Sequence, residues 1–198
     1  MVENIKTIGQ IYDEVAQSFY EMREAFTTEK KYIDMFVEKV VNGGLVLDLG
    51  CGCGTPIDVY LVNKGFDVVG LDDSEAMLVL AAHHIPEMRV LWADMRDAQF
   101  EPEFDGIIEW WSLFHLPIEE QKKVIQNSHG WLVKGGVFQF TTGSYAYEES
   151  SNVMLGVELP YYSASREEYE LLLEEIGYKK VFCESDQEGH LVWMVEKV

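Results

Sequence analysis

The sequence predicts an α/β protein with a doubly wound, mostly parallel sheet of seven strands that ends in a C-terminal antiparallel β-hairpin. Short, continuously apolar runs alternate along the chain with segments of helical periodicity, which is typical of a parallel sheet covered on both faces. The last two runs are joined only by a short turn, so they can pair only as antiparallel strands. Hydrophobic residues make up 47% of the 198 residues, which is enough for a sizeable core. Because no linker or repeat divides the chain, we expect a single domain over residues 1–198.

The N-terminal segment, residues 1–41, is predicted to contain two helices, over 10–25 and 28–41. In the second, apolar residues recur at the spacing of one buried face: Ile33, Phe36, Val37 and Val40. The core, residues 45–142, contains five predicted strands: Leu45–Leu49, Val68–Leu71, Val90–Trp92, Phe104–Trp110 and Val137–Thr141. The helices predicted between them are Ile57–Lys64, Ser74–His83 and Ile118–Val133.

After the core, residues 143–165 are predicted to be a loop, because the stretch 143–162 has no clear periodicity. A loop this long in a compact domain is usually functional or disordered. The segment 166–198 begins with a helix over Arg166–Ile176, for which Gly177 is the predicted left-handed C-cap. The terminal hairpin follows, with strands at Lys179–Cys183 and Leu191–Val195.

The charge balance excludes some classes of protein. Fifteen Lys and Arg against thirty-five Asp and Glu give a net charge of −20, and such a field repels phosphate backbones and anionic lipid surfaces. Nucleic acid and membranes are therefore not expected as partners. No apolar run approaches the ~18 residues of a membrane span, and the polar start is unlike a signal peptide. Three cysteines do not indicate a disulfide framework, so a reduced, cytoplasmic location is expected.

The most informative motif is VLDLGCGCGTP at residues 46–56. A buried strand leads into a loop with glycines at every second position from Gly50, and a helix is predicted to begin with Thr55 as its N-cap. Glycines let the backbone turn sharply and let a ligand approach the main chain. The next strand ends at Asp72, 22 residues after Gly50, where an acid binds the vicinal hydroxyls of a ribose.

The loop carries no Lys or Arg, and its spacing differs from the GxGxxG of dinucleotide sites. A nucleoside with an amino-acid-like tail therefore fits better than a pyrophosphate, since backbone N–H groups suit a carboxylate and Asp48 can interact with an ammonium group. Cys51 and Cys53 lack the usual zinc-ligand spacing and have no second cysteine pair, so no metal is expected.

At this point the chain resembles the class I S-adenosylmethionine (SAM) dependent methyltransferases. Asp48–Gly54 and Asp72 are similar to the first motif and the ribose-binding acid of that family. Trp92-Ala93-Asp94-Met95 resembles the third motif, whose acid binds the adenine amino group while the next residue lines the ring. Residues 104–116 and 131–142 resemble the fourth motif and the element after it. One departure is Asp73, where the family usually has an apolar or small residue.

The resemblance implies a Rossmann-like fold and transfer of a methyl group from SAM to a small-molecule acceptor, which leaves S-adenosylhomocysteine. The two tyrosines of the first helix are similar to those of a lid that closes over the SAM amino-acid moiety. The implied cofactor-binding residues are Tyr12, Tyr20, Asp48, Gly50, Cys51, Gly52, Asp72, Asp73, Asp94, Met95, Glu109 and Trp110. The expected acceptor site is the 143–165 loop, with Tyr145, Tyr147, Tyr161 and Tyr162.

His115 is the candidate general base, which is needed only if the acceptor is protonated at working pH; a structural role for this histidine stays open. His190 is expected to be structural, and either Trp110 or Trp111 to line the pocket. Two other functions also stay open. A non-catalytic SAM-binding or regulatory protein would keep every cofactor residue. A nicotinamide-dependent oxidoreductase would share the sheet and the ribose acid, although the glycine spacing and the terminal hairpin disfavour it. The sequence determines neither the acceptor nor the oligomeric state.

Overall fold

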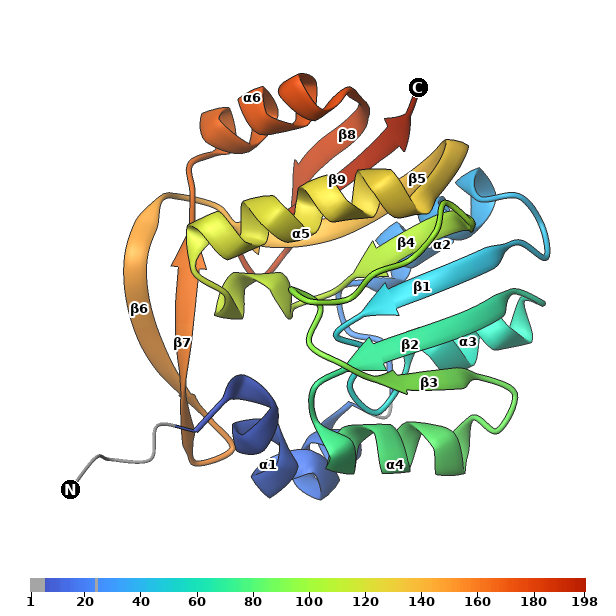
Figure 1. Cartoon of the computed structure of the whole chain (residues 1–198). Helices are drawn as coiled ribbons and strands as arrows, with labels where there is room; N and C mark the ends of the chain where they lie inside the picture. Colours follow the sequence, from blue (N-terminus) through green and yellow to red (C-terminus); the bar gives the residue numbers. More distant parts are fainter. Residues whose placement is uncertain (1–5, 24) are drawn as a thin grey trace.

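The computed structural model describes residues 6–23 and 25–198, and it confirms the predicted fold class (Figure 1). One seven-stranded sheet has the order β3-β2-β1-β4-β5-β9-β8. The first five strands along the chain pair in parallel, whereas β9 is antiparallel to both β5 and β8. The strands are β1 (Leu45–Leu49), β2 (Asp67–Asp72), β3 (Arg89–Trp92), β4 (Phe104–Glu109), β5 (Leu132–Gly143), β8 (Tyr178–Ser185) and β9 (His190–Lys197).

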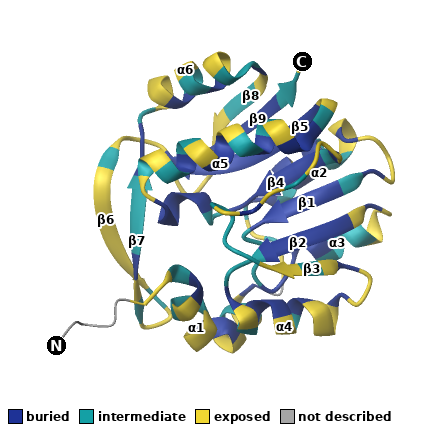
Figure 2. Cartoon of the chain, in the orientation of Figure 1, coloured by how far each residue is buried: buried dark blue, intermediate teal, exposed yellow. Residues whose placement is uncertain are grey.

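Helices cover both faces of the sheet. On one face, α5 (Ile118–Trp131) and α6 (Arg166–Ile176) pack on alternate residues of the strands, among them Leu47 and Phe138. On the other face, α2 (Lys30–Lys39) and α3 (Ile57–Asn63) pack on the intervening residues, among them Val46. The central strands are buried throughout (Figure 2), which is why their sequences are continuously apolar.

Two further helices frame the sheet edge. Helix α4 (Glu75–His84) runs beside β3, and α1 (Ile8–Met22) packs on α4 rather than on the sheet. Thr7 caps α1 in a capping box with Gln10, so the helix starts earlier than the predicted residue 10. Residue 24, which the prediction also placed in this helix, lies outside the described residues, as does the polar start at 1–5. Among the described residues, none of the helices is long and apolar enough to cross a membrane.

The predicted strand at Val137–Thr141 is longer at both ends. The sequence predicts a helix up to Val133, followed by a glycine turn, but in the structure the strand already begins at Leu132, which pairs with Phe104. The register then shifts, and Gly135 has a φ of 82°. The predicted cap at Thr55 is wrong: α3 begins at Ile57 without a side-chain cap, and the Thr55 hydroxyl lies 3.4 Å from the Cys53 sulfur. Gly177 is the left-handed C-cap of α6, as predicted, with a φ of 97°.

The segment 143–165 is not a loop, and this corrects the prediction. It forms a second sheet of two antiparallel strands, β6 (Tyr147–Met154) and β7 (Val157–Ser163). Polar residues lie on both faces of β6, which is exposed along most of its length (Figure 2), so the strand has no apolar alternation to detect. In Figure 1 this hairpin stands at the ends to which the parallel strands point. It contacts α1 and the 3-10 turn η1 (Leu113–His115).

Candidate functional site

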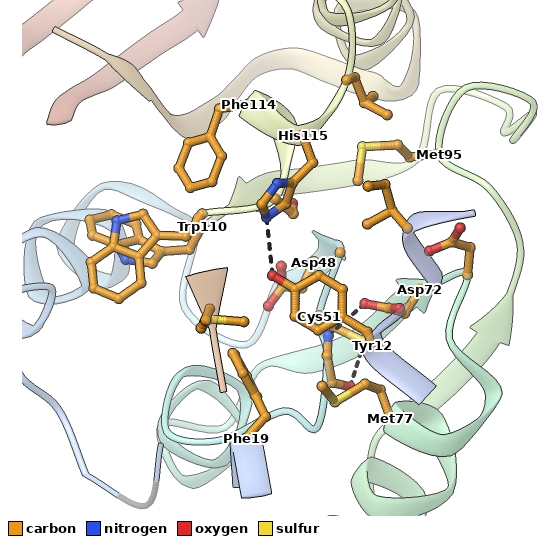
Figure 3. Close-up of a pocket in the computed structure, with 18 of the residues that line it drawn as sticks. Tyr12, Phe19, Asp48, Cys51, Asp72, Met77, Met95, Trp110, Phe114 and His115 are labelled. Atoms are coloured by element: carbon orange, nitrogen blue, oxygen red, sulfur yellow. Dashed lines mark hydrogen bonds between the residues drawn. The ribbon is translucent and has the colours of Figure 1, made fainter. Parts of the chain in front are cut away.

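A cavity of about 690 Å³ lies at the carboxyl ends of the parallel strands. The glycine loop and β2 contribute one end of it, while the residues after β4, the β6–β7 hairpin and the start of β9 contribute the other. Helix α1 passes beside both ends and supplies Tyr12 and Phe19 to the wall (Figure 3). Open α/β sheets bind ligands in this crevice, so the cavity is the candidate active site.

The glycine loop lies against the end of β2. The amides of Gly50 and Cys51 both donate to the Leu71 carbonyl, at 2.7 and 3.1 Å. Gly50 has a φ of 74°, and a Cβ built there would lie 2.3 Å from the hydroxyl oxygen of Ser112. Only glycine fits this close approach to the residues after β4.

Asp72 joins the loop to β2. Its two carboxylate oxygens accept hydrogen bonds from the backbone N–H groups of Gly52 and Ser74, each at 2.8 Å. Burial raises the pKa of Asp72 to about 6, against the opposing effect of these two bonds. Each oxygen keeps a second lone pair, and the side chain lines the cavity, so it can still accept from two ribose hydroxyls.

Asp48 and Asp58 form a pair of buried acids under the glycine loop. Burial is the main cause that raises the pKa of both carboxyl groups, to about 8 for Asp58, and their mutual repulsion adds to it for Asp48. Among the described residues, neither Oδ1 of Asp48 nor either oxygen of Asp58 has a hydrogen-bond partner. Buried acids without a cation suit a ligand that brings one, and the ammonium group of SAM would do so beside Asp48. Sequence analysis alone does not indicate Asp58, apart from its place in the first turn of a predicted helix.

Asp73, Asp94 and Met95 also line the cavity. Burial alone would raise the pKa of Asp94, but hydrogen bonds from Arg96 outweigh it and lower that pKa. The carboxylate of Asp73 accepts the backbone N–H of Gly9 at 3.1 Å. The residue that departs from the family pattern therefore holds the start of α1 in place.

Two of the predicted cofactor residues do not line the cavity. The Tyr20 ring stacks on His84 with a centroid distance of 4.3 Å, on the side of α1 that faces α4. Glu109 is fully buried, and its carboxylate accepts the backbone N–H groups of Ser112, Leu113 and Thr141. The geometry therefore makes Glu109 a support for the turn after β4, and it places Tyr20 outside the pocket.

His115 is held at both ring nitrogens. The Pro160 carbonyl can only accept, so Nδ1 donates to it at 2.8 Å, and Nε2 accepts from the Tyr12 hydroxyl at 3.0 Å (Figure 3). Burial lowers the pKa of His115 to about 4. Burial also raises the pKa of Tyr12, which keeps its phenol protonated. These contacts disfavour the predicted role of general base near neutral pH and make His115 the anchor of α1.

The second end of the cavity is aromatic. Rings of four residues follow one another around it: Trp111 and His190 at 5.7 Å, His190 and Phe114 at 5.7 Å, and Phe114 and Tyr161 at 5.3 Å between centroids. Trp110 lies behind Trp111, and both line the cavity. Trp111 has a φ of 62°, which is rare for a bulky residue, and its backbone N–H donates to the Thr141 hydroxyl at 2.8 Å.

Of the four tyrosines predicted for the acceptor pocket, only Tyr161 lines the cavity. Tyr145 is exposed, and Tyr147 and Tyr162 also lie outside the lining. His190, which the sequence analysis treated as structural, is a lining residue that was missed. The sequence predicts pairing of the last two strands only with each other. In the structure β9 is also antiparallel to β5, which places His190 opposite Gly143 at the carboxyl end of β5. Within the described part of the chain, no group of three or more His, Cys, Asp or Glu side chains is arranged to hold a metal ion.

Taken together, the strand order, the glycine loop after β1, the acid that ends β2 and the acid-lined cavity define the class of SAM-dependent methyltransferases with a Rossmann-like fold. The sequence comparisons agree. The profile of a family described as "Methyltransferase domain" matches residues 46–136. The chain belongs to the class I SAM-dependent methyltransferases, and SAM is its cofactor.

Three individual proteins illustrate the similarity. An uncharacterised methyltransferase from Alkaliphilus oremlandii is 22% identical over 159 residues, which are 74% of this chain and 72% of that protein. A tRNA (carboxymethyluridine(34)-5-O)-methyltransferase from Arabidopsis thaliana is 28% identical over 75% of this chain, but only 35% of the plant protein is covered. The SAM-bound structure of CalS10, an amino pentose methyltransferase from Micromonospora echinaspora, superposes with a TM-score of 0.73 at 19% identity and covers 100% of both chains.

Proposed function

We propose that this protein transfers the methyl group of SAM to a small-molecule acceptor. The observation that supports this proposal is the division of one cavity into two unlike ends. Acids surround the end beside the glycine loop, and that environment suits a sulfonium, an ammonium group and ribose hydroxyls. Aromatic side chains surround the other end, which suits the apolar body of a small organic molecule.

Two features favour a small acceptor over a nucleic acid. Helix α1 and the β6–β7 hairpin both contact the region around the cavity, and the Tyr12–His115 hydrogen bond joins α1 to η1. Both elements therefore lie where a polymer would have to approach the cavity. The net charge of −20 also opposes the approach of a phosphate backbone.

The same acids argue against a nicotinamide cofactor. Asp48, Asp72, Asp73 and Asp94 all line the cavity near the glycine loop, while Arg96 is already paired with Asp94. A pyrophosphate placed there would face negative charge without a free cationic partner among these residues.

SAM, when bound, supplies a methyl group that its sulfonium already activates. The chain then has to position the acceptor against this methyl group and to exclude water from the site. In this proposal Asp72 holds the ribose, Asp48 receives the ammonium group with the buried Asp58 behind it, and Met95 lines the adenine. His115 fixes Tyr12 over the cavity, and the closed site orients the acceptor in line with the methyl group.

Calorimetry with SAM and S-adenosylhomocysteine, followed by methyl release from labelled SAM with a panel of small acceptors, tests the proposal. We expect both ligands to bind and at least one acceptor to be methylated. Deleting residues 153–157 at the hairpin tip should abolish methyl transfer while cofactor affinity changes little. Tight cofactor binding with no turnover by any acceptor would favour a non-catalytic SAM-binding protein.

A further inference from the structure

His190 forms a pair with Asp186 at the aromatic end of the cavity. Its Nδ1 lies 3.0 Å from Oδ2 of Asp186, whose side chain is completely buried, whereas the imidazole is 27% exposed. The other oxygen of Asp186 accepts the backbone N–H groups of Glu188 and His190, at 2.9 and 2.8 Å. The Tyr32 hydroxyl donates to the Ser185 carbonyl at 3.2 Å and holds the same turn from α2. These hydrogen bonds fix the orientation of the Asp186 carboxylate independently of its contact with the imidazole.

This arrangement determines the tautomer of His190. A carboxylate can only accept, so Nδ1 carries the proton and Nε2 keeps its lone pair. Across residues 6–23 and 25–198, no hydrogen bond is made to Nε2 of His190. The contrast with His115 is direct, because both nitrogens of that ring are occupied and burial lowers its pKa to about 4.

The position of His190 relative to the aromatic residues suits a planar acceptor. Its ring is nearly parallel to that of Phe114, with an angle of 19° and a centroid distance of 5.7 Å, and Trp111 lies beside it. The indole N–H of Trp111 is buried and has no hydrogen-bond partner among the described residues. A hydroxyl group bound beside these rings can donate its proton to Nε2 of His190.

The charged groups around His190 and the neighbouring Trp111 come from the turn between β8 and β9 and from the end of α1. Asp186 is in its own turn, Glu188 is in the cavity wall, and Arg23 at the end of α1 lies over the other neighbour, Trp111, at 4.9 Å from the ring centroid. Glu29 pairs with Arg23 at 2.6 Å, so this cation is already balanced.

We propose that His190 is the general base of the methyl transfer, that Asp186 positions it, and that the acceptor is a planar molecule with a weakly acidic hydroxyl group, as in a phenol. The hydroxyl proton passes to Nε2. The oxygen bonds to the methyl carbon as the carbon–sulfur bond breaks, and that electron pair stays on sulfur as the neutral thioether of S-adenosylhomocysteine. The imidazolium later releases its proton to water. This inference rests on the proposed function and adds the base and the acceptor class to it.

The first test uses 4-nitrophenol, whose phenolate absorbs visible light, and the full chain saturated with S-adenosylhomocysteine. We expect the bound probe to ionise about one pH unit below the free probe, because the imidazolium stabilises the phenolate. His190→Gln should abolish that shift, and Asp186→Asn should reduce it, because an amide can donate to Nδ1 and leaves the proton on Nε2. His83→Gln, an exposed histidine on α4, is the matched control and should behave as the wild type.

The second test follows methyl transfer from labelled SAM to a panel of phenols. His190→Gln should lower kcat by about 10²–10⁴-fold with an unchanged KM for SAM, and His115→Gln should have a smaller effect on kcat. An unshifted probe, no binding of the probe at millimolar concentrations, or a phenol methylated at the wild-type rate by His190→Gln would each overturn the inference. If S-adenosylhomocysteine itself fails to bind, the proposed function fails first, so the two failures are distinguishable.

Discussion

The two ends of the cavity are built in opposite ways. The end proposed to bind SAM, here called the cofactor end, comes from residues close together in the chain: the glycine loop and the acid that ends the next strand. Backbone N–H groups hold it together. The end proposed to bind the acceptor, here called the acceptor end, comes from side chains that are distant in sequence, such as Trp111, Tyr161 and His190, and ring contacts hold it together. Binding of a fixed cofactor needs a fixed backbone, whereas the choice of acceptor depends on side chains that can differ without disturbing the sheet.

The largest expected effect is a loss of SAM affinity caused by a change at the cofactor end alone. Gly52→Val should weaken SAM binding by more than about 100-fold, because a side chain at this φ of 54° enters the space between Phe19 and Met77 that the ligand must use. Calorimetry gives the affinity. Gly65→Val is the matched control: its φ of 89° imposes similar strain, but nothing lies within 4 Å of the new Cβ. Equal losses of affinity in both variants would mean that strain, not the site, is responsible.

The ribose contact should come next in size. Asp72→Asn should cost about 1.5–3 kcal/mol of binding free energy, or about 10–150-fold in SAM affinity, since a charged hydrogen-bond acceptor becomes neutral. Asp67→Asn at the other end of β2 changes the same charge at an exposed surface pair with Arg89 and should leave affinity within about twofold. Similar affinities for the two variants would remove Asp72 from the site.

The buried acids predict a pH dependence of the cofactor end. Their folded-state pKa values are above the ordinary value, to about 8 for Asp58 and about 6 for Asp72. The folded state therefore binds more protons than the unfolded state between about pH 4 and pH 8. The free energy of unfolding falls as pH rises through that window.

We accordingly expect the melting temperature of the free protein to be at least about 3 °C lower at pH 8 than at pH 5.5. Asp58→Asn should flatten the dependence, and S-adenosylmethionine should stabilise more at the higher pH, since its ammonium group then meets ionised acids. Differential scanning calorimetry at several pH values measures all three. A flat profile for the wild type would contradict the assignment of buried, unpaired acids.

The smallest expected effect concerns α1, which passes beside both ends of the cavity. Tyr12→Phe removes the hydroxyl that donates to His115 and should weaken S-adenosylhomocysteine binding by about 2–10-fold, the worth of one hydrogen bond. Tyr20→Phe on the same helix should change affinity by less than about twofold, because Tyr20 lies against His84 outside the cavity. If Tyr20→Phe has the larger effect, the lid closes through a different contact.

Local order along the chain is sufficient to predict the cofactor end. The loop at residues 50–54, the acid at 72 and the acid at 94 are each set by local order along alternating strands and helices, and parallel pairing brings the ends of β1 and β2 together without further information. The order of the central elements was likewise predictable, because β1, β2 and β4 are buried on both faces and are therefore mostly apolar.

The side chains that meet at the acceptor end cannot be predicted in this way, because the three-dimensional fold brings them together. The hairpin at 147–163 is too polar to show a pattern, yet it brings Pro160 to His115 and Tyr161 to Phe114. Burial then deprives His115 of basicity, while the tight turn at Asp186 orients His190. Likewise, no local pattern predicts that Asp48 and Asp58, ten residues apart in the chain, are buried together. Contacts between side chains from distant elements depend on distances in space, and a linear pattern records only distances along the chain.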